Sequence, residues 1–109
     1  MNHFLLAEAP SEGSTDTRYG AVSLPLLRQN LCAVGCQKAR LKAVVAGGSD
    51  LLSNMRAIGT ENARFALDWL AQDGIVVERE DIGSARARRV RFSPSSGVCE
   101  IIHVQSPPR

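Results

Sequence analysis

The fold is decided by the stretch LKAVVAGG, residues 41–48, in which a short apolar run ends in two glycines. A run of this kind, rich in β-branched valine, predicts a buried β-strand over residues 41–46. The pair Gly47 and Gly48 then predicts a turn that needs positive φ. Phosphate-binding loops also contain glycine, but their spacings, G-x-G-x-x-G and G-x-x-x-x-G-K-[ST], do not occur here. We therefore interpret the stretch as a strand and its closing turn.

A helix and a second strand are predicted after this turn. Thr60 is expected to be the N-cap of a helix that reaches residue 72 or 73, and Gly74 is expected to end it in a left-handed conformation. Residues 75–80 then predict a strand, whereas residues 51–57 are ambiguous and are interpreted as loop. The apolar face of the helix consists of Ala63, Ala66, Leu67 and Leu70, widened by Phe65 and Trp69.

Before the central strand, the sequence predicts a short strand over residues 3–7, a loop over 8–17 and a helix over 21–34. Gly35 is placed to stop this helix. Pro25 is tolerated only near a first turn, so the helix is expected to begin nearer to Leu24. One face of the helix carries Leu24, Leu27, Leu31 and Val34.

The carboxyl-terminal part predicts a hairpin, with strands over residues 87–93 and 98–104. In the first of these strands, Val90 and Phe92 face one way and Arg89 and Arg91 face the other. Residues 105–109, which include two prolines, are expected to form a loose tail. Two helices and about five strands in this order indicate an α/β (α+β) layered sandwich, formed by a single domain over residues 1–104.

Composition favours a globular domain, with 44% hydrophobic and 22% charged residues in a chain of 109. The net charge of +2 is too small to indicate a nucleic-acid partner. No apolar run is long enough to be inserted in a membrane, and no secretion leader is evident. Three cysteines, an odd number, favour a reducing, cytoplasmic location over a disulfide framework.

The cysteines do not predict a metal site. Cys32 and Cys36 lie one helical turn apart, but two thiolates are too few for structural zinc. Cys99 and His103 share a strand face at a separation of about 13 Å, too far for direct contact. We interpret all three thiols as small buried side chains that fill core space, and we expect no cofactor.

Two further groups of polar residues are open to more than one interpretation. The basic cluster of Arg86, Arg88, Arg89 and Arg91 is interpreted as a solvated strand face, or as a surface that meets an acidic partner. Asn62 is most simply an exposed helix residue, although its amide could also cap a helix or tether a loop.

Six fragments of the sequence, in this order, resemble one known family. They are MNHF (1–4), Tyr19-Gly20, KAVVAGG (42–48), IGTEN (58–62), GIVV with DIG (74–77 and 81–83), and RRVRF with SGV (88–92 and 96–98). Each fragment is weak alone, but together they resemble the CheD family of bacterial chemotaxis. Ala46 and Ser84 depart from the family pattern, which has an aromatic residue and a glycine at these places.

The resemblance implies a chemoreceptor glutamine deamidase, which hydrolyses receptor glutamine side chains to glutamate and is associated with hydrolysis of glutamyl methyl esters. It implies that His3 is the catalytic histidine, whereas a lone histidine beside apolar residues is more often a core residue. The family's nucleophile is a cysteine upstream of that histidine, in a Gly-Ser-Cys turn. We therefore expect a chain that is truncated at its amino terminus and lacks the family's first strands and the nucleophile.

Two hypotheses follow for function. In the first, the chain is part of a deamidase and acts on the cytoplasmic helices of methyl-accepting chemoreceptors. In the second, it is a non-catalytic module that binds chemoreceptors or a CheC-type phosphatase. A pull-down with receptor cytoplasmic fragments, paired with mass spectrometry for the conversion of glutamine to glutamate, separates the two hypotheses.

Overall fold

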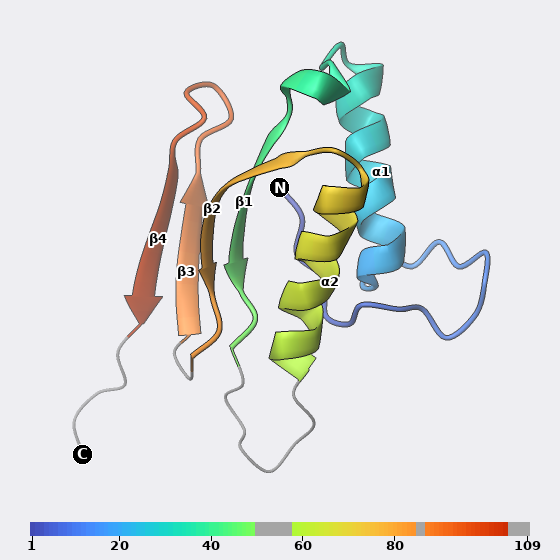
Figure 1. Cartoon of the computed structure of the whole chain (residues 1–109), viewed down its shortest axis with the longest axis horizontal. Coiled ribbons are helices and arrows are strands. Elements are labelled where there is room, and N and C mark those ends of the chain that lie inside the picture. Colours follow the sequence, from blue (N-terminus) through green and yellow to red (C-terminus); the bar gives the residue numbers. More distant parts are fainter. Residues whose placement is uncertain (50–57, 85–86, 105–109) are drawn as a thin grey trace.

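The computed structural model describes residues 1–49, 58–84 and 87–104. These residues form two α-helices, one short 3₁₀ helix and four strands, and Figure 1 shows both α-helices on one side of the strands. Helix α2 packs on strands β1 and β2, and helix α1 packs on α2. The predicted α+β layered sandwich is confirmed. The predicted loop over residues 51–57 and the tail over 105–109 lie outside the described residues.

Helix α1 spans Gly20–Ala33 and therefore begins earlier than Pro25 suggested. The amide N–H groups of Val22 and Ser23 donate to the Tyr19 carbonyl, which starts the helix. Pro25 lies inside it, so the Ala21 carbonyl lacks its usual helical donor.

The end of α1 follows the predicted glycine. Gly35 has φ of 104°, its N–H donates to Cys32, and the N–H of Cys36 donates to Leu31, as in a Schellman motif. Val34 is 78% exposed, so its predicted place on the buried face was wrong. A 3₁₀ helix over Lys38–Arg40, not predicted from the sequence, then leads to the first strand.

The central unit is strand, helix, strand. Strand β1 (Lys42–Gly47) pairs in parallel with β2 (Val76–Ile82), with a register shift between Ala43 and Val44. Helix α2 (Ile58–Gln72) connects them. Gly74 ends α2 with φ of 75°, as predicted. The prediction of Thr60 as N-cap was wrong, because the helix already includes Ile58.

The core is small and lies between α2 and the parallel strands. Among the residues that the structure describes, four hydrophobic ones are buried: Ala63, Ala66, Leu70 and Ile75. Three of these belong to the apolar face predicted for α2, and the fourth begins the segment that leads into β2. Small alanines on this face let the helix approach the strands closely. Neither described helix combines the length and hydrophobicity needed to cross a bilayer.

Strands β3 (Ala87–Phe92) and β4 (Cys99–Val104) form an antiparallel hairpin. They make a second two-stranded sheet that has no backbone ladder to the first among the described residues. At the other end of the chain, the predicted strand over residues 3–7 was wrong. The segment makes one isolated bridge, between Leu6 and Tyr19, and its backbone hydrogen bonds go to Arg18, Gly20 and Ala21 at the start of α1.

Candidate functional site

The amino-terminal segment presents His3, the predicted site residue, at the surface. The His3 side chain is exposed, whereas the next residue, Phe4, is half-buried. In the part of the chain that the structure describes, no hydrogen bond or ion pair reaches the imidazole. The position of this ring therefore depends on how the residues after it are held.

Backbone bonds attach the segment to the start of α1. The N–H groups of Leu5 and Leu6 both donate to the Arg18 carbonyl, at 2.8 and 3.3 Å. In return, the N–H of Gly20 donates to the Leu6 carbonyl at 2.8 Å. These bonds fix the direction of the segment without making it part of a sheet.

An aromatic contact supplies the packing. The rings of Phe4 and Phe65 meet edge to face, with centroids 6.2 Å apart and planes at 75°. Gly20 lies against both rings, and a Cβ there would be 3.0 Å from Phe4 and 3.1 Å from Phe65. Glycine at this position therefore makes room for the contact that anchors the residue next to His3.

A side-chain bond attaches the segment to α2. The Asn62 amide Nδ2 donates to the Leu5 carbonyl at 2.8 Å, joining residues far apart in the sequence. Of the interpretations left open for Asn62, the structure supports the tethering role. This bond and the Phe4–Phe65 contact both connect the segment to the amino-terminal half of α2.

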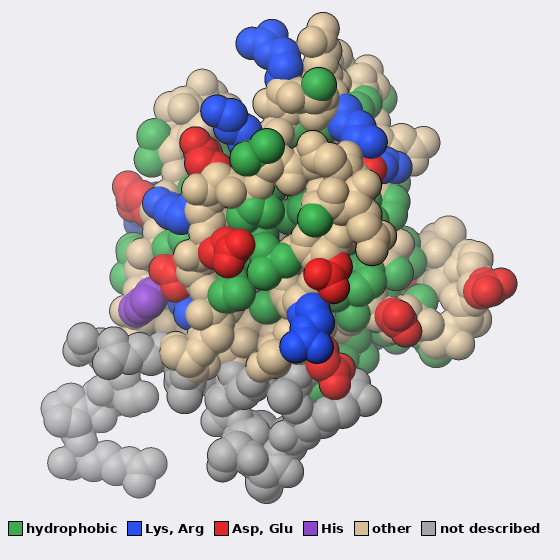
Figure 2. All heavy atoms as spheres, in the orientation of Figure 1, with side chains coloured by type: hydrophobic (Ala, Val, Ile, Leu, Met, Phe, Trp, Pro, Cys, Tyr) green, Lys and Arg blue, Asp and Glu red, His purple; other side chains and the backbone are tan. Residues whose placement is uncertain are grey.

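A groove of about 660 Å³ runs between this segment and α2. Its hydrophobic floor includes Leu6 and Phe65, and its rim carries Glu8, Arg64 and Asp68. Figure 2 shows hydrophobic side chains gathered on this face of the molecule, with acidic and basic side chains around them. The mixture suits a peptide better than a small anion, because carboxylates outnumber the cation on the rim.

The cysteines lie away from His3, and the prediction that all three are buried was wrong. Cys32 and Cys36 are exposed, and Cys99 is half-buried on β4. Phe4 packs on Gly20, at the first residue of α1, whereas Cys32 lies on the order of 18 Å further along the same helix. Cys32 lies in the last turn of α1, and Cys36 follows Gly35 just beyond the end of the helix. Neither of these helix thiols is placed to react together with His3.

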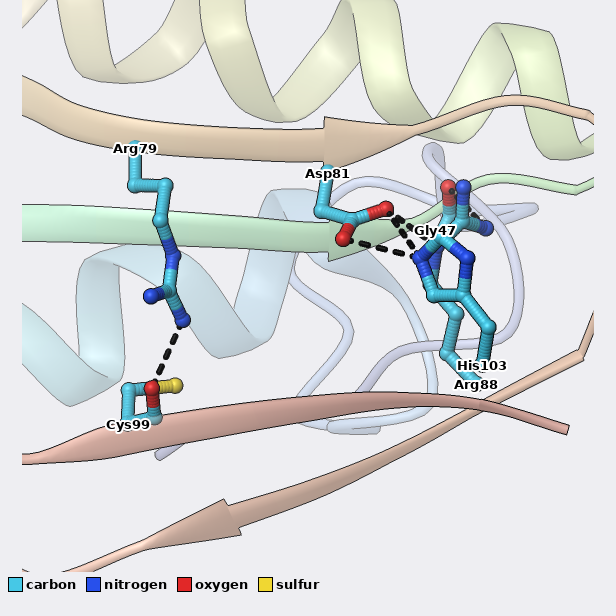
Figure 3. A network of polar contacts seen from close by, with 6 residues as sticks. All are labelled: Gly47, Arg79, Asp81, Arg88, Cys99 and His103. Atoms are coloured by element: carbon cyan, nitrogen blue, oxygen red, sulfur yellow. Dashed lines mark hydrogen bonds and ion pairs between the residues drawn. The ribbon is translucent and has the colours of Figure 1, made fainter.

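A second polar cluster joins the two sheets (Figure 3). The Asp81 carboxylate of β2 accepts from Arg88 Nε of β3 at 2.8 Å and contacts His103 Nε2 of β4 at 2.9 Å. Arg88 also donates to the Gly47 carbonyl at 3.3 Å. The bonds from Arg88, and then from His103, hold the pKa of the Asp81 carboxyl below its usual range.

Arg88 was wrongly grouped with the solvated arginines. Its side chain is only 4% exposed, whereas Arg89 and Arg91 are exposed, and Arg86 lies outside the described residues. The strand alternation contained the signal, because a period of two places Arg88 on the same face as Val90. Register confirms this arrangement, since Arg88 lies opposite His103 on β4.

A third cluster lies where α2 ends and was not predicted. The Asp73 carboxylate accepts from Arg28 and, at 3.1 Å, pairs with Lys38. The Arg28 guanidinium also lies over the Trp69 ring, 5.5 Å from its centroid. Burial raises the pKa of Asp73, but the bonds from Lys38 and Arg28 outweigh it, so the net pKa is lowered. These contacts join α1 to the end of α2 and stabilise the packing of the two helices.

The arrangement limits the chemistry available. Within the described residues, no three His, Cys, Asp or Glu side chains gather as a metal site. His3 is not among the residues that line the groove, but an exposed imidazole on an anchored segment can transfer protons to or from a group that reaches it.

The fold and this site define a layered α+β domain with an exposed histidine on its amino-terminal segment and a surface groove between that segment and α2. A family model described as "CheD chemotactic sensory transduction" matches residues 5–103, so the match begins two residues after His3. The chain belongs to the CheD family.

Similar proteins include a "Probable chemoreceptor glutamine deamidase CheD 1" from Ruegeria sp. (strain TM1040), 39% identical over 104 residues. That match covers 95% of this chain and 56% of the relative. A "Probable chemoreceptor glutamine deamidase CheD" from Zymomonas mobilis is 40% identical, covering 97% of this chain and 60% of the relative. One from Bordetella petrii is 42% identical, covering 89% and 45%. The chain thus spans about half the length of the curated relatives that it matches.

Proposed function

We propose that the chain supplies the proton-transfer histidine, His3, of a cytoplasmic chemoreceptor glutamine deamidase. The observation that carries the proposal is the match over nearly the whole chain to relatives whose names state this activity. The exposed His3 side chain supports it, because a ring sealed in the core could not meet a substrate amide. The substrate is a glutamine side chain on a receptor cytoplasmic helix.

The reaction needs a nucleophile and a proton carrier. A cysteine thiolate attacks the amide carbon, and His3 gives a proton to the departing nitrogen, so that ammonia and a thioester form. His3 then takes a proton from water, which attacks the thioester and releases glutamate and the thiol. Backbone N–H groups stabilise the negative oxygen in both steps. The location of Cys32 and Cys36 at the far end of α1 from the Phe4 contact supports a nucleophile other than these two thiols.

Mass spectrometry of a receptor cytoplasmic fragment tests this proposal, because conversion of an amide to an acid changes peptide mass. The chain is incubated with the fragment alone and together with a polypeptide that contains the upstream portion of a relative. We expect no glutamate from the chain alone and glutamate from the combination. His3→Ala is expected to abolish the product, whereas His103→Ala, the matched control, is expected to retain it.

Two results would contradict the proposal. Deamidation by the chain alone would show that one of its own thiols is the nucleophile. Product formation by the combination containing His3→Ala would show that this imidazole is not the proton carrier.

A second candidate is a non-catalytic module that binds a chemoreceptor or a CheC-type phosphatase. This candidate is favoured because Cys32 and Cys36 lie far from the contact that anchors the residue next to His3. Binding of the chain to a receptor fragment or to the phosphatase, with no deamidation in any combination, would favour this candidate over the first.

A further inference from the structure

We propose that Asn62 is a positioning residue for His3, acting through the Leu5 carbonyl. This inference rests on the role proposed above for His3. The imidazole has no bond of its own among the described residues, so its location is set by the two residues that follow it. Phe4 is fixed by packing and Leu5 by hydrogen bonds, and one of these comes from the Asn62 side chain.

The two sides of the Leu5 backbone are held by different elements. Its N–H donates to the Arg18 carbonyl, which precedes α1. Its carbonyl accepts from Asn62, which is on α2. The peptide group between Leu5 and Leu6, two residues from His3, is therefore held from both sides. Asn62 of α2 bonds its carbonyl, and the Arg18 carbonyl before α1 accepts from its N–H. Without the Asn62 donor, this peptide group is bonded only to the Arg18 carbonyl, on the α1 side.

The interaction needs a donor, which makes it testable without a change in volume. A carbonyl oxygen accepts from the Asn62 amide, whereas an aspartate of the same shape has only acceptors when ionised. Asn62→Asp would bring a carboxylate oxygen towards the Leu5 carbonyl, and the two would repel each other. The aromatic contact between Phe4 and Phe65 does not involve the amide and remains.

Substitution of Asn62 is not expected to disturb the hydrophobic core. Its side chain is half-buried and reaches across the surface, and the buried alanines of α2 lie at other positions on the helix. The expected effect of substitution is therefore local to the amino-terminal segment. Gln72, an exposed amide on the same helix, provides a matched control.

Nuclear magnetic resonance of the intact chain tests the proposal, because the sequence has only two histidines. We expect Asn62→Asp to shift the ring resonances of His3 and leave those of His103 unchanged. We also expect hydrogen exchange at the Leu5 and Leu6 amides to accelerate by about tenfold. Gln72→Ala should change neither, and Asn62→Gln, which keeps a donor, should recover part of the exchange protection.

Unchanged His3 resonances in a folded Asn62→Asp chain would overturn the proposal. So would equal shifts at both histidines, because these would indicate a general loss of structure instead of a local one. The result is independent of deamidation. If His3 moves as expected but no receptor glutamine is ever converted, the positioning role stands and the proposed function fails.

Discussion

Substitution of Gly48 by alanine should destabilise the domain at the contact between the β1 turn and α2. Gly48 has φ of 68°, a left-handed conformation that costs a residue with a Cβ about 1–2 kcal/mol. A Cβ there would also lie 2.8 Å from the Ala63 Cβ and 2.8 Å from the Gly59 carbonyl oxygen. Overpacking of this kind costs about 1–3 kcal/mol, so the total is about 2–5 kcal/mol.

Urea unfolding, followed by circular dichroism, measures this effect. Because small domains have free energies of unfolding of only about 5–15 kcal/mol, a loss of this size should lower the midpoint substantially. Gly97→Ala is the control, since Gly97 has φ of 75° but a Cβ there would meet no described atom within 4 Å. Gly97→Ala should therefore show only the conformational part of the cost.

The difference between the two variants isolates the steric contribution. The reasoning predicts that Gly48→Ala is less stable than Gly97→Ala by about 1–3 kcal/mol. Equal free energies of unfolding would refute it, because they would mean that α2 withdraws from the turn without cost. In that case the close approach of Gly48 to Gly59 would not determine where α2 begins.

Three other predictions concern charges and thiols. Asp81→Asn should lower the free energy of unfolding at pH 6 but much less at pH 3. The pKa of Asp81 is lowered in the folded protein, so its carboxylate stabilises the fold above about pH 4, and this stability is lost as pH falls through the folded-state pKa. An equal loss of unfolding free energy at both pH values would contradict this. Asp73→Asn should lower the melting temperature, measured by calorimetry, because two basic side chains lose their shared carboxylate; an unchanged temperature would show that this cluster is not stabilising. Ellman's reagent should modify two thiols quickly and one slowly in the native protein, in the order expected from the exposure of Cys32, Cys36 and Cys99; three equal rates would exclude that order.

Sequence patterns predicted the central unit because its signals are local. The glycine after each helix, Gly35 and Gly74, ends that helix where predicted, and both have positive φ and take part in Schellman bonds. The alanine face of α2 was also predicted, since its period requires only a helix and a core. The start of α1 was misplaced because tertiary contacts of the preceding turn offset the cost of Pro25.

The parts that could not be predicted depend on contacts between distant residues. No local pattern indicates that Asp81 is shared by side chains from two other strands, or that Asn62 reaches the Leu5 carbonyl. His3 was identified by family resemblance alone, and its catalytic role stays a prediction. The prediction that Cys32 and Cys36 are buried was wrong, because hydrophobicity indicates which residues favour a core but not which positions the core covers.

The separation of the two sheets has a consequence for protein engineering. Among the described residues, the β3–β4 hairpin meets the parallel strands through side chains and not through a backbone ladder, so no strand pairing between the two sheets sets its register. A hairpin transplanted from a relative therefore needs to reproduce the side chains that meet β2, which are Arg88 and His103 at Asp81, and to place the Cys99 carbonyl where Arg79 can donate to it. Chimaeras built at this junction are a practical route to exchanging surfaces within the family.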